Sequence, residues 1–217
     1  FYSYQHPVSL VKYSHNFHFL NPKIGLVFTP TTANRIYLSL GKSQSEPKRD
    51  DYLQNDSLHT PTPEKLFDIE AGYQRLNDAF RWEINGFWMK YKDELVLTGQ
   101  INDVGEYART NVGSSYRLGI ESSICKSWAE DRWNVAVNAA WMHCRIRSFT
   151  QYIDDWDTGD QITTQYLNTP TAYSPEITTF LEIGYKFVVQ SNRKLSTSAN
   201  VKYVGPQYMD NTGEAAV

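Results

Sequence analysis

The chain has 217 residues, a formal net charge of −3 and 14% aromatic residues, among them 15 Tyr and 6 Trp. Its mean hydropathy of −0.53, and the lack of any run of about 18 apolar residues, exclude a protein built of membrane-spanning helices. Lysine and arginine are scattered rather than clustered, which argues against nucleic acid as a partner. Abundant aromatics in a polar sequence favour half-buried strands, as in a transmembrane β-barrel or a sugar-binding β-sandwich.

Apolar and polar residues alternate in segment after segment, and this predicts about eight antiparallel strands. In RIYLSLG, for example, Ile36, Leu38 and Leu40 share one face of a strand. The segment around Phe87 is apolar on both faces, so alternation does not show which of its faces meets lipid. In chain order, strands are expected near residues 22–29, 35–43, 64–74, 80–97, 106–125, 132–149, 174–189 and 194–204.

The connections between these segments fall into two classes. Short polar turns are expected at 29–34, 74–78, 127–131 and 190–193, whereas 42–63 and 150–174 are long, polar and proline-bearing. Short and long connections alternate along the chain, as they do in an outer-membrane barrel with short periplasmic turns and long extracellular loops. Several segments exceed the ~9–11 residues that a strand needs to cross a membrane, so they are expected to project beyond it.

Four stretches of the sequence resemble the TonB-dependent outer-membrane receptors, in particular the siderophore-receptor-like members common in Bacteroidetes. The stretches are FHFLNPKIGLVFTP from Phe17, GKSQSEPKRDDY from Gly41, PEKLFDIEAGYQ from Pro63 and NGFWMKYKDELVLTGQINDVGEYARTNVGSSYRLGIE from Asn85. The resemblance implies an up-and-down barrel of twenty-two strands, plugged by an N-terminal domain that carries a box for the TonB protein. Residues 1–217 are expected to be a C-terminal part of such a barrel, without plug domain, TonB box or closing strands.

The resemblance also implies a function, namely TonB-energised uptake of a bulky nutrient, a ferric siderophore, across the bacterial outer membrane. The implied partners are outer-membrane lipid, the nutrient, and the plug domain and TonB through the missing N-terminal part; no enzymatic activity is implied. Extracellular loops at 1–20, 43–63, 98–106 and 150–173 would capture the ligand. Groups in these loops that suit an anionic or aromatic ligand are Arg49, Tyr52, Tyr107, Tyr152 and Trp156.

Three sets of side chains could suggest a metal, haem or catalytic site, but each has an ordinary structural explanation. The histidines at 6, 15, 18, 59 and 143 suggest haem or metal, and the aspartates at 154, 155, 157 and 160 suggest calcium, but loop residues explain both sets better. No metal or cofactor is therefore expected. A hydrolase would need a pair of carboxylates, yet the polar residues that share a strand face are better explained as wet lumen wall or plug contacts; they are Asp68, Glu70, Arg117 and Glu121.

Two further questions stay open at this point. Cys125 and Cys144 are the only cysteines, and their spacing leaves open whether they are bridged. A soluble carbohydrate-binding β-sandwich is the alternative to a barrel, and it predicts short strands and loops that are not sorted by length. If the chain is part of a barrel, its open edges and apolar face are expected to make the isolated fragment pair with a second copy.

Overall fold

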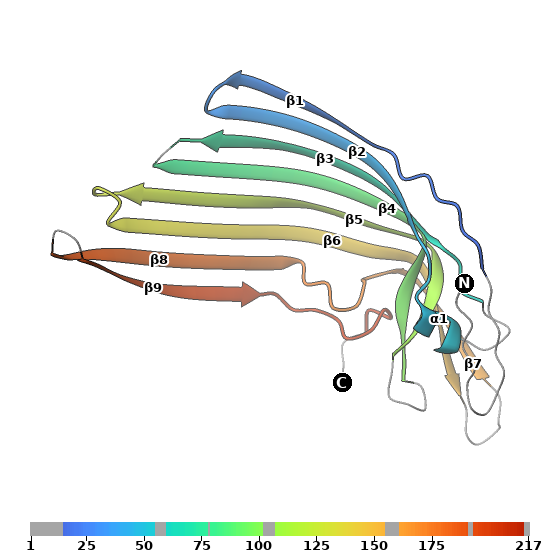
Figure 1. Cartoon of the computed structure of the whole chain (residues 1–217). Helices are drawn as coiled ribbons and strands as arrows, with labels where there is room; N and C mark the ends of the chain where they lie inside the picture. The colour runs from blue at the N-terminus through green and yellow to red at the C-terminus, as the bar shows by residue number, and fades with distance from the viewer. Residues whose placement is uncertain are drawn as a thin grey trace.

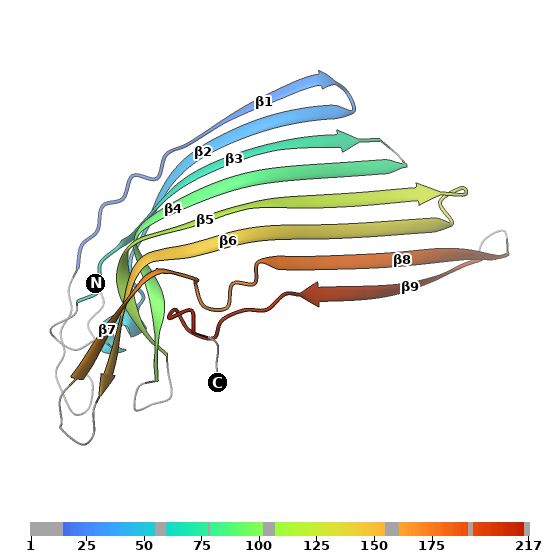
Figure 2. The same cartoon turned by 180° about the vertical axis from the view of Figure 1, so that it is seen from behind.

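The structure is a computed structural model that describes residues 15–54, 60–77, 79–101, 107–154, 161–190 and 193–214. Its elements form one curved antiparallel sheet with a single short helix (Figures 1 and 2). They are β1 (Lys23–Thr31), β2 (Asn34–Ser45), α1 (Arg49–Gln54), β3 (Glu64–Leu76), β4 (Phe80–Ile101), β5 (Tyr107–Trp128), β6 (Trp133–Asp154), β7 (Gln161–Thr169), β8 (Ile177–Gln190) and β9 (Arg193–Val204). Among the described residues, no helix is both long and apolar enough to cross a membrane.

The strand order is β1-β2-β3-β4-β5-β6-β8-β9, with β7 paired to the outer part of β6. The predicted fold class, an all-β antiparallel meander, is therefore confirmed, and each of the eight expected strands is present with small shifts at its ends. The count of twenty-two strands stays a prediction. The short turns lie together at one end of the sheet, called the turn end, and α1 and β7 lie at the other, called the loop end (Figure 1).

Two of the expected long loops contain regular structure. The loop expected at 150–173 is largely a hairpin, because β6 continues to Asp154 and pairs with β7, with Tyr152 opposite Thr163. The segment QITT was expected to be part of a loop because it is polar. Its β-branched residues nevertheless favour an extended backbone. The loop expected at 43–63 holds α1, and the one at 98–106 is shortened because β4 reaches Ile101.

The register sorts the side chains into one polar and one apolar face. Glu70 lies opposite Phe87, and Phe87 lies opposite Gly119, so these residues share the polar face. By the same register the acidic and basic residues predicted to line a lumen lie together on this face; they are Asp68, Glu70, Arg117 and Glu121. Trp88 lies between Ile69 and Leu118 on the apolar face, which settles the orientation of the segment around Phe87.

Aromatic side chains border the apolar face at both ends. Near the turn end the ring centroids of Trp133 and Tyr185 are 4.6 Å apart, and Trp128 stacks on Trp133 at 6.2 Å. Toward the loop end the border is formed by Phe67 with Trp88 and by Trp141. Trp133 and Trp141 are eight residues apart on β6. At about 3.3 Å per residue this is roughly 26 Å, close to the ~25 Å apolar band of a transmembrane barrel.

No described residue of the chain covers this apolar face. In the described part of the chain the buried apolar side chains are Val96, Val112, Cys144, Ile146 and Phe149, and all lie beyond the border at Trp88 and Trp141. The chain exposes 15453 Å², whereas a compact monomer of its mass would expose ~10,300 Å². One sheet without a second layer is not the packing of a soluble β-sandwich, which buries two apolar faces against each other.

The two cysteines are free. On β6, Cys144 lies opposite Arg117, whereas Cys125 lies opposite Ala136. Ala136 and Cys144 are eight residues apart on one strand. This is roughly 26 Å, and a disulfide requires a Cα separation below about 7 Å. The register, which the sequence spacing did not reveal, therefore rules out a bridge within the chain.

A charge in the centre of the apolar face is expected to destabilise a barrel that contains this sheet. Val137 lies midway between Trp133 and Trp141, so Val137→Arg should cost about 2–4 kcal/mol when the protein is folded in lipid vesicles. The matched control is Asn138→Arg, one residue further along but on the polar face, and it should cost less than about 1 kcal/mol. Equal losses in urea-induced unfolding would contradict a lipid-facing assignment.

Candidate functional site

The loop end carries the features that lie beyond the apolar band. The long strands β4, β5 and β6 bend toward the loop end, and α1 and β7 gather beside their ends (Figures 1 and 2). The projecting part is held by a small apolar cluster of Val96, Val112 and Ile146, with Tyr166 of β7 packed against it. The loop end therefore has a core of its own, which fixes the hairpin of β6 and β7 onto the strands.

An ion pair with a buried carboxylate lies next to this cluster. The Glu94 carboxylate is 5% exposed and accepts hydrogen bonds from the Ser115 hydroxyl and the Arg117 guanidinium. The Arg117 guanidinium carbon also lies 4.7 Å from the centroid of the Tyr91 ring, a cation–π contact. Arg117, which the sequence suggested as a wet wall residue or plug contact, thus has partners within the chain itself.

The sequence did not single out Glu94 because strand alternation puts it on the apolar face. The preceding residue, Asp93, has a φ of 59°, in the left-handed region. The Asn111 side-chain amide donates to the carbonyl oxygen of Asp93 at 2.6 Å and holds this conformation. Because of the turn at Asp93, Glu94 reaches Arg117 on the polar side of the sheet. Aspartate adopts positive φ more often than most residues other than glycine, but neither a glycine nor an Asn-Gly or Asp-Gly pair marks the position in the sequence.

The segment that follows β9 returns to the loop end. Asn211 is 1% exposed, and its side-chain amide donates to the carbonyl oxygen of Leu97 on β4 at 2.5 Å. Its side-chain oxygen accepts a hydrogen bond from the backbone N–H of Ala172 at 2.7 Å. The backbone N–H of Tyr173 donates to Tyr208 at 2.9 Å. Residues 205–214 therefore tie β4 to the connection between β7 and β8, a role that sequence reasoning missed.

Helix α1 carries two of the predicted ligand-binding residues, Arg49 and Tyr52. Its start is fixed by the Asp51 carboxylate, which accepts a hydrogen bond from the backbone N–H of Lys48 at 2.7 Å. The Tyr52 ring stacks on His15 with a centroid distance of 5.0 Å, and the stack continues to Phe17 at 5.8 Å. Burial raises the pKa of the Tyr52 phenol, and the nearby carboxylates of Glu46 and Asp51 raise it further.

The remaining predicted residues are only partly placed. Tyr152 lies on the hairpin of β6 and β7, at the same end as α1. Tyr107 begins β5 opposite Ile101, and its side chain is outside the described part. Trp156 falls outside the described residues, and so does most of the acidic run proposed for calcium. Across the described ranges, no group of three or more His, Cys, Asp or Glu side chains could hold a metal ion.

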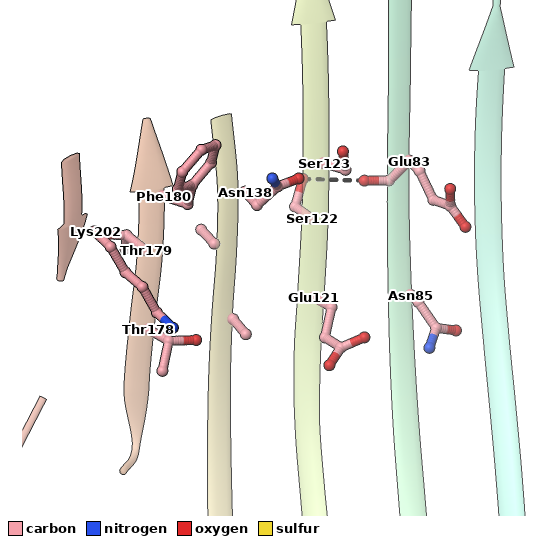
Figure 3. Close-up of a pocket in the computed structure, with 12 residues that line it drawn as sticks. Glu83, Asn85, Glu121, Ser122, Ser123, Asn138, Thr178, Thr179, Phe180 and Lys202 are labelled. Carbon is pink, nitrogen blue, oxygen red and sulfur yellow. Dashed lines mark hydrogen bonds between the residues drawn. The ribbon is translucent and has the colours of Figure 1, made fainter. Parts of the chain in front are cut away.

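A hollow of about 420 Å³ lies on the polar face between the two aromatic borders (Figure 3). Its charged and polar lining comes from five strands and includes Glu83, Asn85, Glu121, Asn138, Thr178 and Lys202. The Glu83 carboxylate accepts a hydrogen bond from Gln74 at 2.9 Å, and Tyr37 donates to Asn85 at 3.1 Å. Tyr37 lies over Gly72, where a β-carbon would overlap its ring. This lining can hydrogen-bond a polar or cationic surface.

Comparison with known proteins identifies the architecture. The sequence matches the model of the family described as TonB dependent receptor-like, beta-barrel, over residues 1–216. The chain belongs to the TonB-dependent receptor β-barrel family. The predicted family resemblance is thereby confirmed, and with it the assignment to a family of receptors. No curated protein matches the sequence.

Solved structures of several receptors and transporters share the fold. They include the copper transporter OprC, with a TM-score of 0.62 and 14% identity. The match covers 87% of this chain and 26% of the OprC chain. The ferric preacinetobactin receptor BauA from Acinetobacter baumannii has a TM-score of 0.60 and 16% identity, covering 89% and 26%. The ferric-catecholate import receptor Fiu from E. coli K12 has a TM-score of 0.58 and 19% identity, covering 92% and 27%. This receptor chain thus spans about a quarter of their length.

The ion pair next to the apolar cluster is expected to stabilise the loop end. Arg117→Met leaves the buried Glu94 carboxylate without its cation and should cost about 2 kcal/mol. This is below the roughly 3–5 kcal/mol of a fully buried pair, because the Arg117 side chain keeps 32% exposure to screening solvent. Urea unfolding of the complete receptor in detergent measures the loss.

Two control variants make this test specific. Adding Glu94→Gln to Arg117→Met should recover part of the loss, since a neutral amide tolerates burial better than a carboxylate. Lys65→Met breaks the more exposed pair with Asp93, at 3.7 Å, and should cost less than about 1 kcal/mol. An additive double variant would show that the two side chains do not interact.

Proposed function

We propose that this chain forms part of the barrel wall and extracellular loops of an outer-membrane receptor for TonB-energised uptake of a bulky nutrient, a ferric siderophore. The observation that carries the proposal is the family match over residues 1–216. The structurally similar proteins include an iron transporter, receptors for ferric siderophores and a copper transporter, and these relatives motivate the choice of an iron complex. The loop end is then the extracellular end, and the turn end faces the periplasm.

Ligand capture would take place at the loop end. Arg49 offers a guanidinium that can pair with an anionic complex, Tyr152 offers an aromatic face and a hydroxyl, and Tyr52 offers an aromatic face. All three lie on elements anchored to the projecting strands rather than on the membrane-spanning wall. Tyr107 and Trp156 belong to the same proposal. Ordered supports around α1 and β7 would limit the conformational entropy that these groups lose when they bind.

Passage would require the other parts of a complete receptor. The chain is proposed to be one piece of a longer barrel, which would hold a plug domain within its lumen and receive energy through TonB. The polar hollow around Glu83, Glu121 and Lys202 faces the space that such a plug would occupy. Its hydrogen-bonding lining suits a contact that must form and break during transport, because polar contacts there can exchange with water.

The isolated chain is proposed to pair with a second copy in water. Among the described strands, β1 and β9 end the sheet, and each has one hydrogen-bonded neighbour. Their free edges and the uncovered apolar face both favour association. The pairing stays a prediction, and it concerns the fragment rather than the function.

Removing the proposed ligand contacts should weaken binding without unfolding the receptor. In the complete receptor, Arg49→Gln combined with Tyr152→Leu is expected to lower the affinity for a ferric siderophore by about 10- to 100-fold. A charge-assisted hydrogen bond contributes roughly 1.5–3 kcal/mol, which corresponds to that range. Titration of the purified receptor with one representative each of iron-loaded catecholate, hydroxamate and mixed siderophores measures the effect.

A turn-end variant provides the control for this titration. Arg132→Gln removes an exposed arginine that pairs with Glu130 at 3.4 Å, and binding should be unchanged. Uptake of the bound siderophore into cells should stop when TonB is absent. A complete receptor that binds none of the three siderophore classes, or uptake that continues without TonB, would rule out the proposed function.

A further inference from the structure

The segment that follows β9 contacts strands that are not its neighbours in the sheet. Among the described strands, β9 pairs only with β8, yet residues 205–214, here called the strap, continue toward the loop end (Figure 1) and reach β4. The side-chain amide of Asn211 donates to the carbonyl oxygen of Leu97, and its oxygen accepts from the backbone N–H of Ala172. One buried amide thus joins the strap to segments that lie 114 and 39 residues away along the chain.

The strap has a local structure that presents this amide. The Asp210 carboxylate accepts hydrogen bonds from the backbone N–H and the hydroxyl of Thr212, at 2.9 and 2.7 Å. Gly213 has a φ of 79°, and a β-carbon there would lie 2.7 Å from Pro170, the residue that follows β7. A side chain at position 213 would therefore strain the backbone and overlap its neighbour. The strap is fitted closely against the end of β7.

The chain around the end of β7 holds two non-glycine residues in the left-handed region. Asn168 has a φ of 54°, and Tyr173 has a φ of 55°. Asparagine adopts this region more readily than most residues, whereas tyrosine seldom does. Such residues persist only where their surroundings hold them, and they gather at ligand clamps. The strap supplies this hold, because Tyr208 accepts the backbone N–H of Tyr173 and Asn211 accepts that of Ala172.

The connection held by the strap anchors a hairpin that carries a proposed ligand contact. Tyr152 lies on the outer part of β6, which pairs with β7. Near the base of this hairpin, Tyr166 packs against the apolar cluster. Further out, Ile153 and Ile162 lie opposite each other and are about half exposed, so this part is not packed into a core. The position of Tyr152 therefore depends on how the end of β7 is anchored.

We propose that Asn211 is a positioning residue for ligand capture, which holds the hairpin of β6 and β7 where Tyr152 can meet the ligand. The proposal rests on the proposed function. Asn211 is 1% exposed, so it acts through the hairpin rather than by touching the ligand. Holding the hairpin in advance tightens binding, because the apparent dissociation constant is the intrinsic one divided by the fraction of receptors that is ready to bind.

The test changes this amide in the complete receptor in detergent. Asn211→Ala loses both hydrogen bonds, whereas Asn211→Asp keeps an acceptor for Ala172 but has a carboxylate that cannot donate to Leu97. Burial raises the pKa of a carboxyl group, so at about pH 5 the introduced group is protonated and can donate again. The matched control is Asn77→Ala, which removes an amide that accepts from the backbone N–H of Phe80 at 2.6 Å at the turn end.

Two quantities are measured for each variant. Association and dissociation rates are recorded with the three iron-loaded siderophores. The position of the hairpin is followed by the distance between two spin labels, attached through Lys92→Cys on β4 and Thr163→Cys on β7 in a receptor whose native cysteines are replaced by serine. Retained resistance to denaturation by detergent on heating shows that the variants fold.

Asn211→Ala is expected to bind about 10-fold more weakly through slower association, as when the ready fraction falls to about one tenth, while its dissociation rate changes less than about twofold. Its spin-label distances should spread over a wider range. Asn211→Asp should behave alike at about pH 8 and recover to within about threefold of the unaltered receptor at about pH 5. Asn77→Ala should match the unaltered receptor.

Four results would overturn the proposal: unchanged association in Asn211→Ala, a loss that falls on dissociation instead, unchanged label distances, or no recovery of Asn211→Asp at about pH 5. A complete receptor that binds none of the siderophores would refute the proposed function. The label distances need no ligand, so they would still decide whether the strap holds the hairpin.

Discussion

One constraint governs the structure, namely that the sheet is a single layer with an apolar face that no described residue of the chain covers. A soluble protein closes such a face with a second sheet or with helices, and this chain supplies neither over the band between Trp133 and Trp141. The face must then be covered by hydrocarbon, and the aromatic borders mark where that hydrocarbon ends. The antiparallel meander and the roughly membrane-thick spacing of the aromatic borders follow from this requirement.

The polar face follows from the same constraint. Successive side chains of a strand point to opposite faces, so each outward apolar residue is followed by one that points inward. The inward neighbours are carboxylates, amides and hydroxyls that line a water-accessible hollow, among them Glu83, Asn85 and Glu121. Wall residues of this kind need no enzymatic explanation. Glu94 differs from them in being buried, and its ion pair with Arg117 joins strands β4 and β5 beyond the loop-end aromatic border.

Much of the fold was predictable from the sequence because alternation and loop length are local signals. They gave the fold class, eight of the strands and the shared face of Asp68, Glu70, Arg117 and Glu121. Strand β7 and helix α1 were missed, since a polar composition looks like a loop even when β-branched residues such as Thr163 and Thr164 favour a strand. The free state of Cys125 and Cys144 depends on register, and the partner of Arg117 depends on one backbone angle, so neither can be read from spacing. Of the predicted ligand contacts, the structure brings Arg49, Tyr52 and Tyr152 to one end of the sheet, which strand order alone suggested.

The position of the left-handed residue Asp93 has a physical reason. As far as Trp88 the outward positions on β4 are apolar and can meet lipid, and the next outward residues are Lys90 and Lys92. Beyond that depth there is water on the outer side, so further apolar residues cannot keep facing outward at low cost. The left-handed backbone at Asp93 changes which residues face inward, so that Val96 enters the buried cluster with Ile146 and Glu94 reaches Arg117. The one residue with positive φ, Asp93, thus lets β4 present alternating apolar and polar residues before it and contribute to a buried protein core after it.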